Sequence, residues 1–240
     1  MQKKALVTGS ATGIGKAIAL DLASKGFDVA FHYNRSEEAA HAACQEAATH
    51  RVKAIALQAD VTKPEEAKLL VENAAKELGG LSVLVNVVGN YLGEKPTSQV
   101  QVHEWQEVFD SNLNATFYVT QPAIPHLKKA NGARIINFAC ASAHHTIAYK
   151  LNAPYVIAKT GIIIYSKSLA QELVKAQITV NVISPGVAEN SIGLEETIPL
   201  LPMKRPATLQ EISNAAYFFI SPKANYITGQ VLEVAGGWRL

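Results

Sequence analysis

The sequence predicts an α/β fold: a parallel, doubly wound sheet with helices on both faces. Two observations carry this prediction. Short apolar segments rich in β-forming residues alternate with longer helical patterns along the first half of the chain, which is typical of such a sheet. A glycine-rich turn also stands between the first apolar segment and the first helical pattern.

Length and composition limit the classes of function. The chain has 240 residues, 48% of them hydrophobic and 18% charged, with no repeat or low-complexity linker, so we expect one domain over 1–240. The net charge of +2 gives no reason to expect nucleic-acid binding, and no apolar run reaches membrane-spanning length. Cys44 and Cys140 form no metal-spaced cluster, and no signal-peptide pattern is present. We therefore expect a cytoplasmic protein without a metal site.

The glycine-rich turn follows a strand at residues 4–8 and precedes a helix that Gly26 closes. Gly9 allows a tight turn, Gly13 lets the backbone approach a phosphate, and Gly15 permits close helix packing. The helix N-terminus offers free N–H groups to a pyrophosphate. A plain strand-to-helix turn is the alternative, but the strand before and the helix after favour a dinucleotide site.

The second strand, residues 28–33, is followed by Asn34-Arg35-Ser36. NAD enzymes usually carry an acid at this strand end, where it binds the adenosine ribose. No carboxylate stands there, and Arg35 could pair with a 2′-phosphate. The sequence therefore favours NADP(H) over NAD(H), with a solvated loop arginine as the alternative.

A third strand over 53–60 ends at Asp60-Val61, and a helix over 64–78 then leads to a fourth strand over 81–86. Asp60 could accept a hydrogen bond from an adenine amine, or it could be an ordinary turn acid. Each further strand and helix in this alternation extends the parallel sheet.

Tyr155 and Lys159 form a second chemical motif. A spacing of four places both side chains on one helix face, with Asn152 as the expected N-cap and Pro154 in the first turn. A free phenol has a pKa of about 10, and a cation one turn away would lower it. The pair could then transfer a proton near neutral pH, and Ser142 could bind the same oxygen. A core-edge tyrosine beside a solvated lysine is the alternative.

These motifs together resemble the short-chain dehydrogenase/reductase family over essentially the whole chain. The motifs are Thr8-Gly9-x3-Gly13-x-Gly15, Asn86-x-x-Gly89 and Tyr155-x3-Lys159, in that order. The resemblance implies a seven-stranded Rossmann sheet with the cofactor at the carboxyl ends of the strands. It also implies an NADPH-dependent carbonyl reductase.

Within the family, the chain most resembles the bacterial 3-oxoacyl-acyl carrier protein reductases. This narrower resemblance implies a 3-oxoacyl thioester substrate in fatty acid biosynthesis, an acyl carrier protein as a candidate partner, and a homotetramer. One alternative is another ketone, sugar or pteridine reductase, because residues 32–36 (HYNRS) also resemble the pteridine reductases. The other is a non-catalytic NADP-binding regulator.

The resemblance assigns catalytic roles to four residues: Tyr155 donates the proton, Lys159 lowers its pKa and contacts the cofactor ribose, Ser142 orients the carbonyl oxygen, and Asn112 organises a water. The expected cofactor contacts are Gly9, Ser10, Ala11, Thr12, Gly13, Ile14, Gly15, Asn34, Arg35, Ser36, Asp60, Val61, Asn86, Val87, Gly89, Tyr155, Lys159, Pro185, Gly186, Val187 and Asn190.

Some positions depart from the family pattern. The usual Asn-Asn-Ala-Gly turn reads Asn86-Val87-Val88-Gly89, and Asn190 replaces a common threonine. Counting back from Tyr155 identifies Ser142 as the catalytic serine, whereas counting forward from the strand at 134–140 identifies Cys140. Ser142 is preferred because a thiol is a weak hydrogen-bond donor.

The substrate loop, residues 190–206, is apolar and about seven residues shorter than in typical carrier-protein reductases, which suggests an open cleft. Packing of this loop against the core is the alternative. Gln171 replaces an arginine that often meets the acidic carrier, although Lys128 and Lys129 could supply positive charge at the mouth. His144 and His145 are expected to be ordinary loop residues.

Overall fold

The computed structural model describes residues 3–145 and 147–239, and it contains the predicted parallel sheet. Seven strands lie in the order β3-β2-β1-β4-β5-β6-β7, and every neighbouring pair is parallel. The chain reverses its direction across the sheet between β1 and β4, which makes their carboxyl ends the topological switch point. The strands are β1 (Lys4–Thr8), β2 (Asp28–Tyr33), β3 (Ala54–Gln58), β4 (Val83–Asn86), β5 (Arg134–Phe138), β6 (Thr179–Pro185) and β7 (Val231–Val234).

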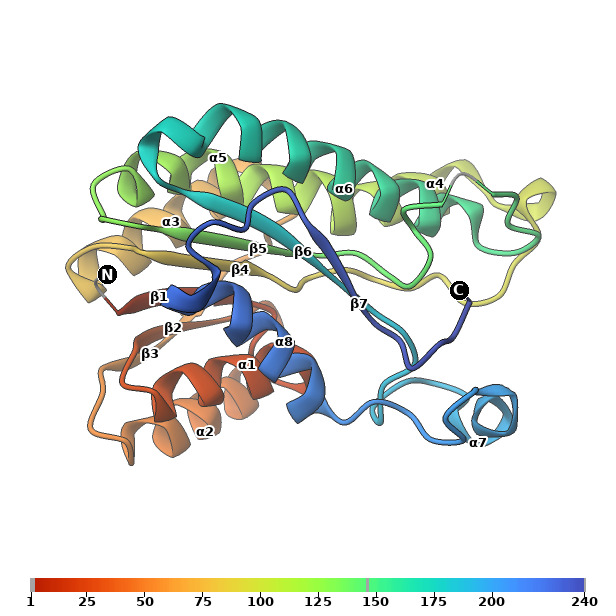
Figure 1. Ribbon diagram of the computed structural model, residues 1–240, viewed down its shortest axis with the longest axis horizontal. Helices are drawn as coiled ribbons and strands as arrows, with labels where there is room; N and C mark the ends of the chain where they lie inside the picture. Colours follow the sequence, from red (N-terminus) through yellow and green to blue (C-terminus); the bar gives the residue numbers. More distant parts are fainter. Residues whose placement is uncertain (1–2, 146, 240) are drawn as a thin grey trace.

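Helices cover both faces of the sheet (Figure 1). One layer contains α1 (Gly13–Ser24), α2 (Glu37–Ala48) and α8 (Leu209–Ile220), and the other contains α3 (Pro64–Leu78), α4 (Val102–Phe109), α5 (Ala115–Leu127) and α6 (Ala153–Leu173). The short α7 (Leu194–Thr197) lies outside both layers, in the loop after β6.

The central strands are apolar on both faces because each face packs against a helix layer. Leu6, Leu84 and Ile135 belong to the core beneath α3, α5 and α6. Their sequence neighbours Val7 and Val85 belong to the core beneath α1 and α8. Successive side chains of a strand point to opposite faces, so a continuous apolar run in these strands fills both cores.

Most expected elements are present, with somewhat shorter bounds. The expected helix over 102–127 contains a π-helical segment, Asp110–Asn114, between α4 and α5. The expected strand over 134–140 ends as β5 at Phe138. Among the described residues, no helix is long and apolar enough to cross a lipid bilayer.

Lys128 and Lys129 do not lie at the mouth of the site. Both residues follow α5, which runs back across the sheet, and β5 begins shortly afterwards at Arg134. The segment between α5 and β5, which contains both lysines, therefore lies at the amino ends of the strands, opposite the switch point (Figure 1). The expectation that they supply charge near the reacting centre is wrong.

Candidate active site

The glycine-rich turn is held in place by a buried histidine of β2. The N–H of Gly9 donates a hydrogen bond to Nδ1 of His32 at 2.9 Å, and Nε2 of His32 lies 3.0 Å from the carbonyl oxygen of Ala59. These contacts require a neutral ring that is protonated on Nε2. Burial lowers the pKa of His32, which favours this neutral form. His32 thus joins the ends of β1, β2 and β3, a role that no local pattern in the sequence indicates.

Gly15 is required by close packing, and Gly9 and Gly13 by left-handed φ values of +64° and +56°. A Cβ on Gly15 would lie 2.2 Å from the carbonyl oxygen of Gly9, so α1 packs directly against the turn. Gly13 has a φ of +56°, and a Cβ there would lie 2.7 Å from Nδ2 of Asn190. The fold therefore brings Asn190, from the loop after β6, to the start of α1, as expected for two parts of one binding site. The fully buried hydroxyl of Ser10 donates to the Val7 carbonyl within the turn.

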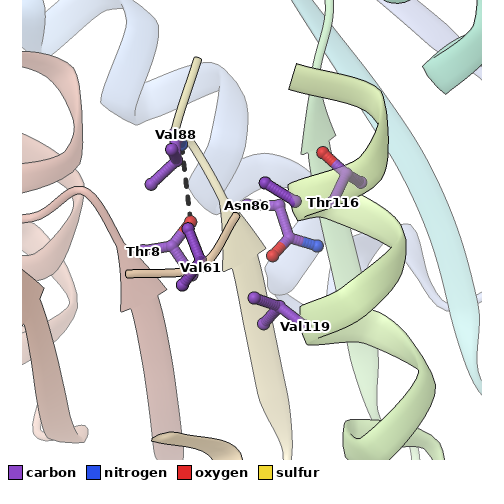
Figure 2. Close-up of a pocket in the computed structure, with 7 residues that line it drawn as sticks. Thr8, Val61, Asn86, Val88, Thr116 and Val119 are labelled. Atoms are coloured by element: carbon purple, nitrogen blue, oxygen red, sulfur yellow. Dashed lines mark hydrogen bonds between the residues drawn. The ribbon is translucent and has the colours of Figure 1, made fainter. Parts of the chain in front are cut away.

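The turn after β4 is attached to β1 through Thr8. Its hydroxyl oxygen accepts hydrogen bonds from the N–H groups of Val87 at 3.0 Å and Val88 at 3.4 Å. The side chain of Asn86 instead points inward and donates to Thr120 and Asn137. Figure 2 shows Asn86 among side chains of β1, α5 and the turns, around a pocket too small for a ligand. The side chain of Asn86 therefore supports the site from within the fold.

Gly89 lies where three parts of the site converge. A Cβ at this position would lie 2.3 Å from Oδ1 of Asn112 and 3.0 Å from Nζ of Lys159. The Asn112 amide donates to the carbonyl oxygens of Asn90 at 3.0 Å and Val108 at 2.9 Å. Its Oδ1 is buried and has no hydrogen-bond partner among the described residues. The π-helical segment thus aims a free acceptor at the turn that follows β4.

Tyr155 and Lys159 lie on α6 at the same end of the sheet. Nζ of Lys159 donates to the carbonyl oxygen of Phe138 at 3.1 Å and lies 5.5 Å from the centroid of the Tyr155 ring. Burial lowers the pKa of Lys159 to about 8. Burial also raises the pKa of Tyr155, because it removes water from around the phenolate. The lowering of this pKa by Lys159 stays a prediction.

Asn152 occupies the expected N-cap position of α6, but its side chain does not cap the helix. It has a left-handed φ of 59°. Its amide donates to the Tyr91 hydroxyl at 2.6 Å, and its Oδ1 accepts from the N–H of Lys95 at 3.3 Å. The Tyr91 ring meets Tyr155 edge-on, with centroids 5.2 Å apart. Tyr91 is half exposed, so it lies between solvent and Tyr155. In the sequence, the only sign of this contact is an aromatic residue shortly after Gly89.

Ser142 and Cys140 occupy different surroundings. Ser142 is fully buried with a φ of 60°, and its hydroxyl bonds to the carbonyl oxygen of Ala141 at 2.7 Å and to the Tyr149 hydroxyl at 2.8 Å. The partly exposed Cys140 interacts electrostatically with Tyr155 and Lys159. The structure therefore brings Cys140 to the reactive pair and places the Ser142 hydroxyl in the adjoining loop.

At the other end of the site, Arg35 is exposed after β2 and lies near Asp60. The Asp60 carboxylate accepts hydrogen bonds from the N–H and the hydroxyl of Thr62, and the hydroxyl contact lowers the pKa of Asp60 most. The Asp60 carboxylate therefore helps to shape its own turn. Asn34 and Ser36, on either side of Arg35, are exposed.

The loop after β6 lies at the end of the candidate site opposite Arg35. A Cβ on Gly186 would lie 2.9 Å from Cα of Ala235, and the Val187 carbonyl accepts the N–H of Ala207 at 2.9 Å. In the substrate loop, Leu201 is buried, while Ile192 and Met203 are largely exposed. Leu201 therefore packs into the fold, while three apolar side chains of the loop, Ile192, Leu200 and Met203, stay exposed.

The sites described above form a continuous line along the carboxyl ends of the strands. Arg35 lies at one end, the glycine turn follows, and Gly89 with Tyr155 and Lys159 lies beyond it. Glycines lie where a bound dinucleotide would come close to the backbone. Tyr155 and Lys159 lie next to this position, where they could transfer a proton to a neighbouring substrate. The described residues contain no group of three metal-ligating side chains.

Known proteins resemble the chain over nearly its whole length. The family model described as enoyl-(acyl carrier protein) reductase matches residues 9–239. The 3-oxoacyl-(acyl-carrier-protein) reductase FabG of Staphylococcus aureus is 36% identical, over 99% of this chain and 98% of that protein. The uncharacterized oxidoreductase YohF of Escherichia coli is 33% identical, over 100% of this chain and 97% of that protein.

Solved structures agree with this result. A short chain dehydrogenase from Burkholderia cenocepacia in complex with NADP has a TM-score of 0.91 and 28% identity, with 99% of this chain and 98% of that chain covered. Acetoin dehydrogenase YohF from Salmonella typhimurium has a TM-score of 0.89 and 33% identity, with 98% of this chain and 97% of that chain covered.

Proposed function

Because the chain belongs to the short-chain dehydrogenase/reductase family of oxidoreductases, we propose that it is an NADPH-dependent carbonyl reductase and that a 3-oxoacyl thioester is its substrate. One observation carries the catalytic part of the proposal. Asn112 Oδ1 and Lys159 Nζ converge on Gly89, and Tyr155 lies one turn before Lys159 on α6. A reactive phenol, a cation and a free acceptor thus share one end of the sheet.

The proposed cofactor is NADP(H), and the residues present fit it. The glycine turn and the start of α1 would hold the pyrophosphate, and exposed Arg35 would pair with the 2′-phosphate. NADP and NADPH are bound in two similar solved structures, the Burkholderia cenocepacia enzyme and a blue fluorescent protein from a metagenomic library. Further proposed contacts are Ser10, Ala11, Thr12, Ile14, Asn34, Ser36, Asp60, Val61, Asn86, Val87, Pro185, Gly186, Val187 and Asn190.

In the proposed reaction, the reduced nicotinamide supplies a hydride to the carbonyl carbon. Tyr155 donates its proton to the carbonyl oxygen, and the positive charge of Lys159 stabilises the phenolate that remains. Asn112 holds a water through its free Oδ1, and this water returns a proton from solvent. The raised pKa of Tyr155 keeps the phenol protonated before each turnover.

The relationship to FabG of Staphylococcus aureus and the free apolar side chains of the substrate loop support the acyl-thioester substrate. A small hydroxyketone or diketone is the second candidate, because an acetoin dehydrogenase matches the chain at a similar identity of 33%. The position of Lys128 and Lys129 at the opposite edge removes one expected contact for an acyl carrier protein.

We also propose a homotetramer in the cytoplasm. Phe117, Ile157 and Ile164 are partly exposed on α5 and α6, and the Phe117 ring contacts Tyr165 of α6 at 5.7 Å between centroids. We call Phe117, Ile157 and Ile164 the α5–α6 patch. Such an apolar face suits contact between two copies. The free thiols of Cys44 and Cys140 suit a reducing compartment.

The direct test is NADPH oxidation with acetoacetyl-coenzyme A, acetoin, diacetyl and an oxidised pterin, repeated with NADH. We expect turnover of the thioester with NADPH. Turnover of only a small ketone or of the pterin would keep the mechanism and reject the thioester. A protein that binds NADPH tightly but reduces none of these compounds would contradict the reductase proposal.

Tyr155→Phe tests the mechanism on whichever substrate is turned over. Loss of the general acid should lower kcat by at least about 100-fold and leave NADPH affinity unchanged, as measured by nicotinamide fluorescence. An equal loss of cofactor affinity and turnover would show that Tyr155 has a structural role instead.

A further inference from the structure

Cys140 is fixed beside the reactive pair by backbone contacts on both sides. The N–H of Ala139 donates to the Ile183 carbonyl and the N–H of Ala141 donates to the Pro185 carbonyl, both at 2.9 Å. Two residues before Cys140, the Phe138 carbonyl accepts the hydrogen bond from Lys159 Nζ. The chain at Cys140 is therefore held between β6 and the start of α6.

The thiol also lies close to the groups that would act on a substrate. Cys140 interacts electrostatically with Tyr155, Lys159 and Tyr91. The same cluster contains the buried Oδ1 of Asn112, which has no partner among the described residues and faces Lys159 across Gly89. The Cys140 thiol thus lies in a cluster of polar groups that could bind a polar ligand.

The hydrogen-bonding groups of Ser142 are occupied by structural contacts. Its N–H donates to the Glu233 carboxylate of β7, while its hydroxyl bonds to Ala141 and Tyr149. Its left-handed backbone turns the chain away from β5. To reach the oxygen bound by Tyr155, the hydroxyl would have to break two hydrogen bonds inside a fully buried site.

We propose that the Cys140 thiol, and not the Ser142 hydroxyl, orients the carbonyl oxygen that Tyr155 protonates. This inference rests on the proposed reductase function and specifies one contact within it. Burial raises the pKa of Cys140 to about 11, so the thiol keeps its proton and acts as a donor. No covalent bond to sulfur forms; the S–H group only donates a hydrogen bond.

Three variants test the assignment, with Cys44→Ala as the control for loss of a distant thiol. Cys140→Ala should lower kcat about tenfold, as expected for loss of one hydrogen bond to the reacting oxygen, with NADPH affinity unchanged. Cys140→Ser should retain or exceed wild-type kcat, because a hydroxyl is a stronger donor. Ser142→Ala should keep kcat near the wild-type value but lower the melting temperature by a few degrees.

A larger loss of kcat in Ser142→Ala than in Cys140→Ala, with both proteins folded, would overturn the assignment. So would a Cys140→Ser variant that is folded, binds NADPH and is no more active than Cys140→Ala. The melting temperature and NADPH affinity of each variant separate these results from misfolding.

Thiol labelling separates this inference from the function it rests on. In the Cys44→Ala background, N-ethylmaleimide is added at pH 9 with and without NADPH, and labelling is followed by intact mass. Protection of Cys140 by NADPH is the expected result. Protection in a protein that reduces no carbonyl would overturn the reductase proposal while leaving Cys140 in the site, whereas unprotected labelling would overturn the position of Cys140 whatever the turnover.

Discussion

The backbone N–H of Gly9 and the Nδ1 atom of His32 form a 2.9 Å hydrogen bond that joins the proposed phosphate-binding turn to the middle of the sheet. The bond needs an unprotonated Nδ1, so the shape of this turn depends on the charge of a buried ring. Nε2 of the same ring lies beside the carbonyl oxygen of Ala59. If the proton moved from Nε2 to Nδ1, both hydrogen bonds of the ring would be lost.

Stability should therefore fall in acid through His32. Its folded-state pKa is lowered from the ordinary value, so near pH 6 the unfolded chain binds more protons than the folded one. The stabilisation is complete above about pH 6.5 and is lost as the pH decreases. Urea unfolding between pH 5 and pH 8 should show this slope, and His32→Gln should reduce it.

The control for this experiment is His41→Gln, because the side chain of His41 is exposed on α2. That variant should keep the wild-type slope. His32→Gln should also lower the free energy of unfolding at pH 8 by about 1–3 kcal/mol, since the N–H of Gly9 loses its partner. An unchanged slope in His32→Gln would contradict the neutral-ring interpretation.

Turnover should fall in alkali through Lys159. Burial lowers the pKa of Lys159 to about 8, and the uncharged amine cannot stabilise the Tyr155 phenolate. Because kcat/KM reports ionisations of the free enzyme, its value for reduction should decline above pH 8. A profile that stays flat to pH 9.5, with the protein still folded by circular dichroism, would show that the charge of Lys159 is not needed.

Arg35 should set the preference between the two nicotinamide cofactors. Arg35→Ala removes the charged partner proposed for the 2′-phosphate, which should raise the KM for NADPH roughly 10- to 100-fold and leave the KM for NADH unchanged. Lys68→Ala, which removes an exposed cation on α3, is the matched control. Equal effects on both cofactors would reject direct pairing of Arg35 with the phosphate.

The α5–α6 patch should be covered by a second copy of the chain. Ile164 is 62% exposed, and Ile164→Glu would place a charge in that contact and should yield a smaller particle in light scattering coupled to gel filtration. Tyr226→Glu changes a fully exposed side chain elsewhere and should not alter the mass. A wild-type protein that elutes as a monomer would refute the assembly.

The sequence predicts those features of the fold that depend on residues close together in the chain. Apolar runs buried on both faces identified the strands, and the spacing of Tyr155 and Lys159 fixed their shared helix. The seven parallel strands are confirmed, as is the family resemblance. The proximity of Asn190 to Gly13 followed from the expected binding site rather than from any local pattern.

What the sequence could not give depends on loop conformation and distant contacts. Counting residues cannot distinguish Cys140 from Ser142, because a left-handed residue at Ser142 redirects the chain between β5 and α6. His32 is an ordinary strand residue until the fold brings Gly9 and Ala59 to its two nitrogens. The local preference of asparagine for helix caps correctly indicated Asn152 as the N-cap residue of α6, but its side chain contacts Tyr91 and Lys95 instead of the first helical turn.

The contacts of Glu233 make the loop after β5 depend on the last strand of the sheet. This residue of β7 binds the N–H of Ser142, 91 positions earlier, and its carboxylate lies 3.1 Å from Nδ1 of His144. While the chain is being synthesised, Ser142 and His144 therefore lack these contacts until β7 has left the ribosome and paired with β6. A nascent chain that has completed only six strands therefore lacks the Glu233 contacts that hold the loop beside the candidate active site, and the last strand supplies them.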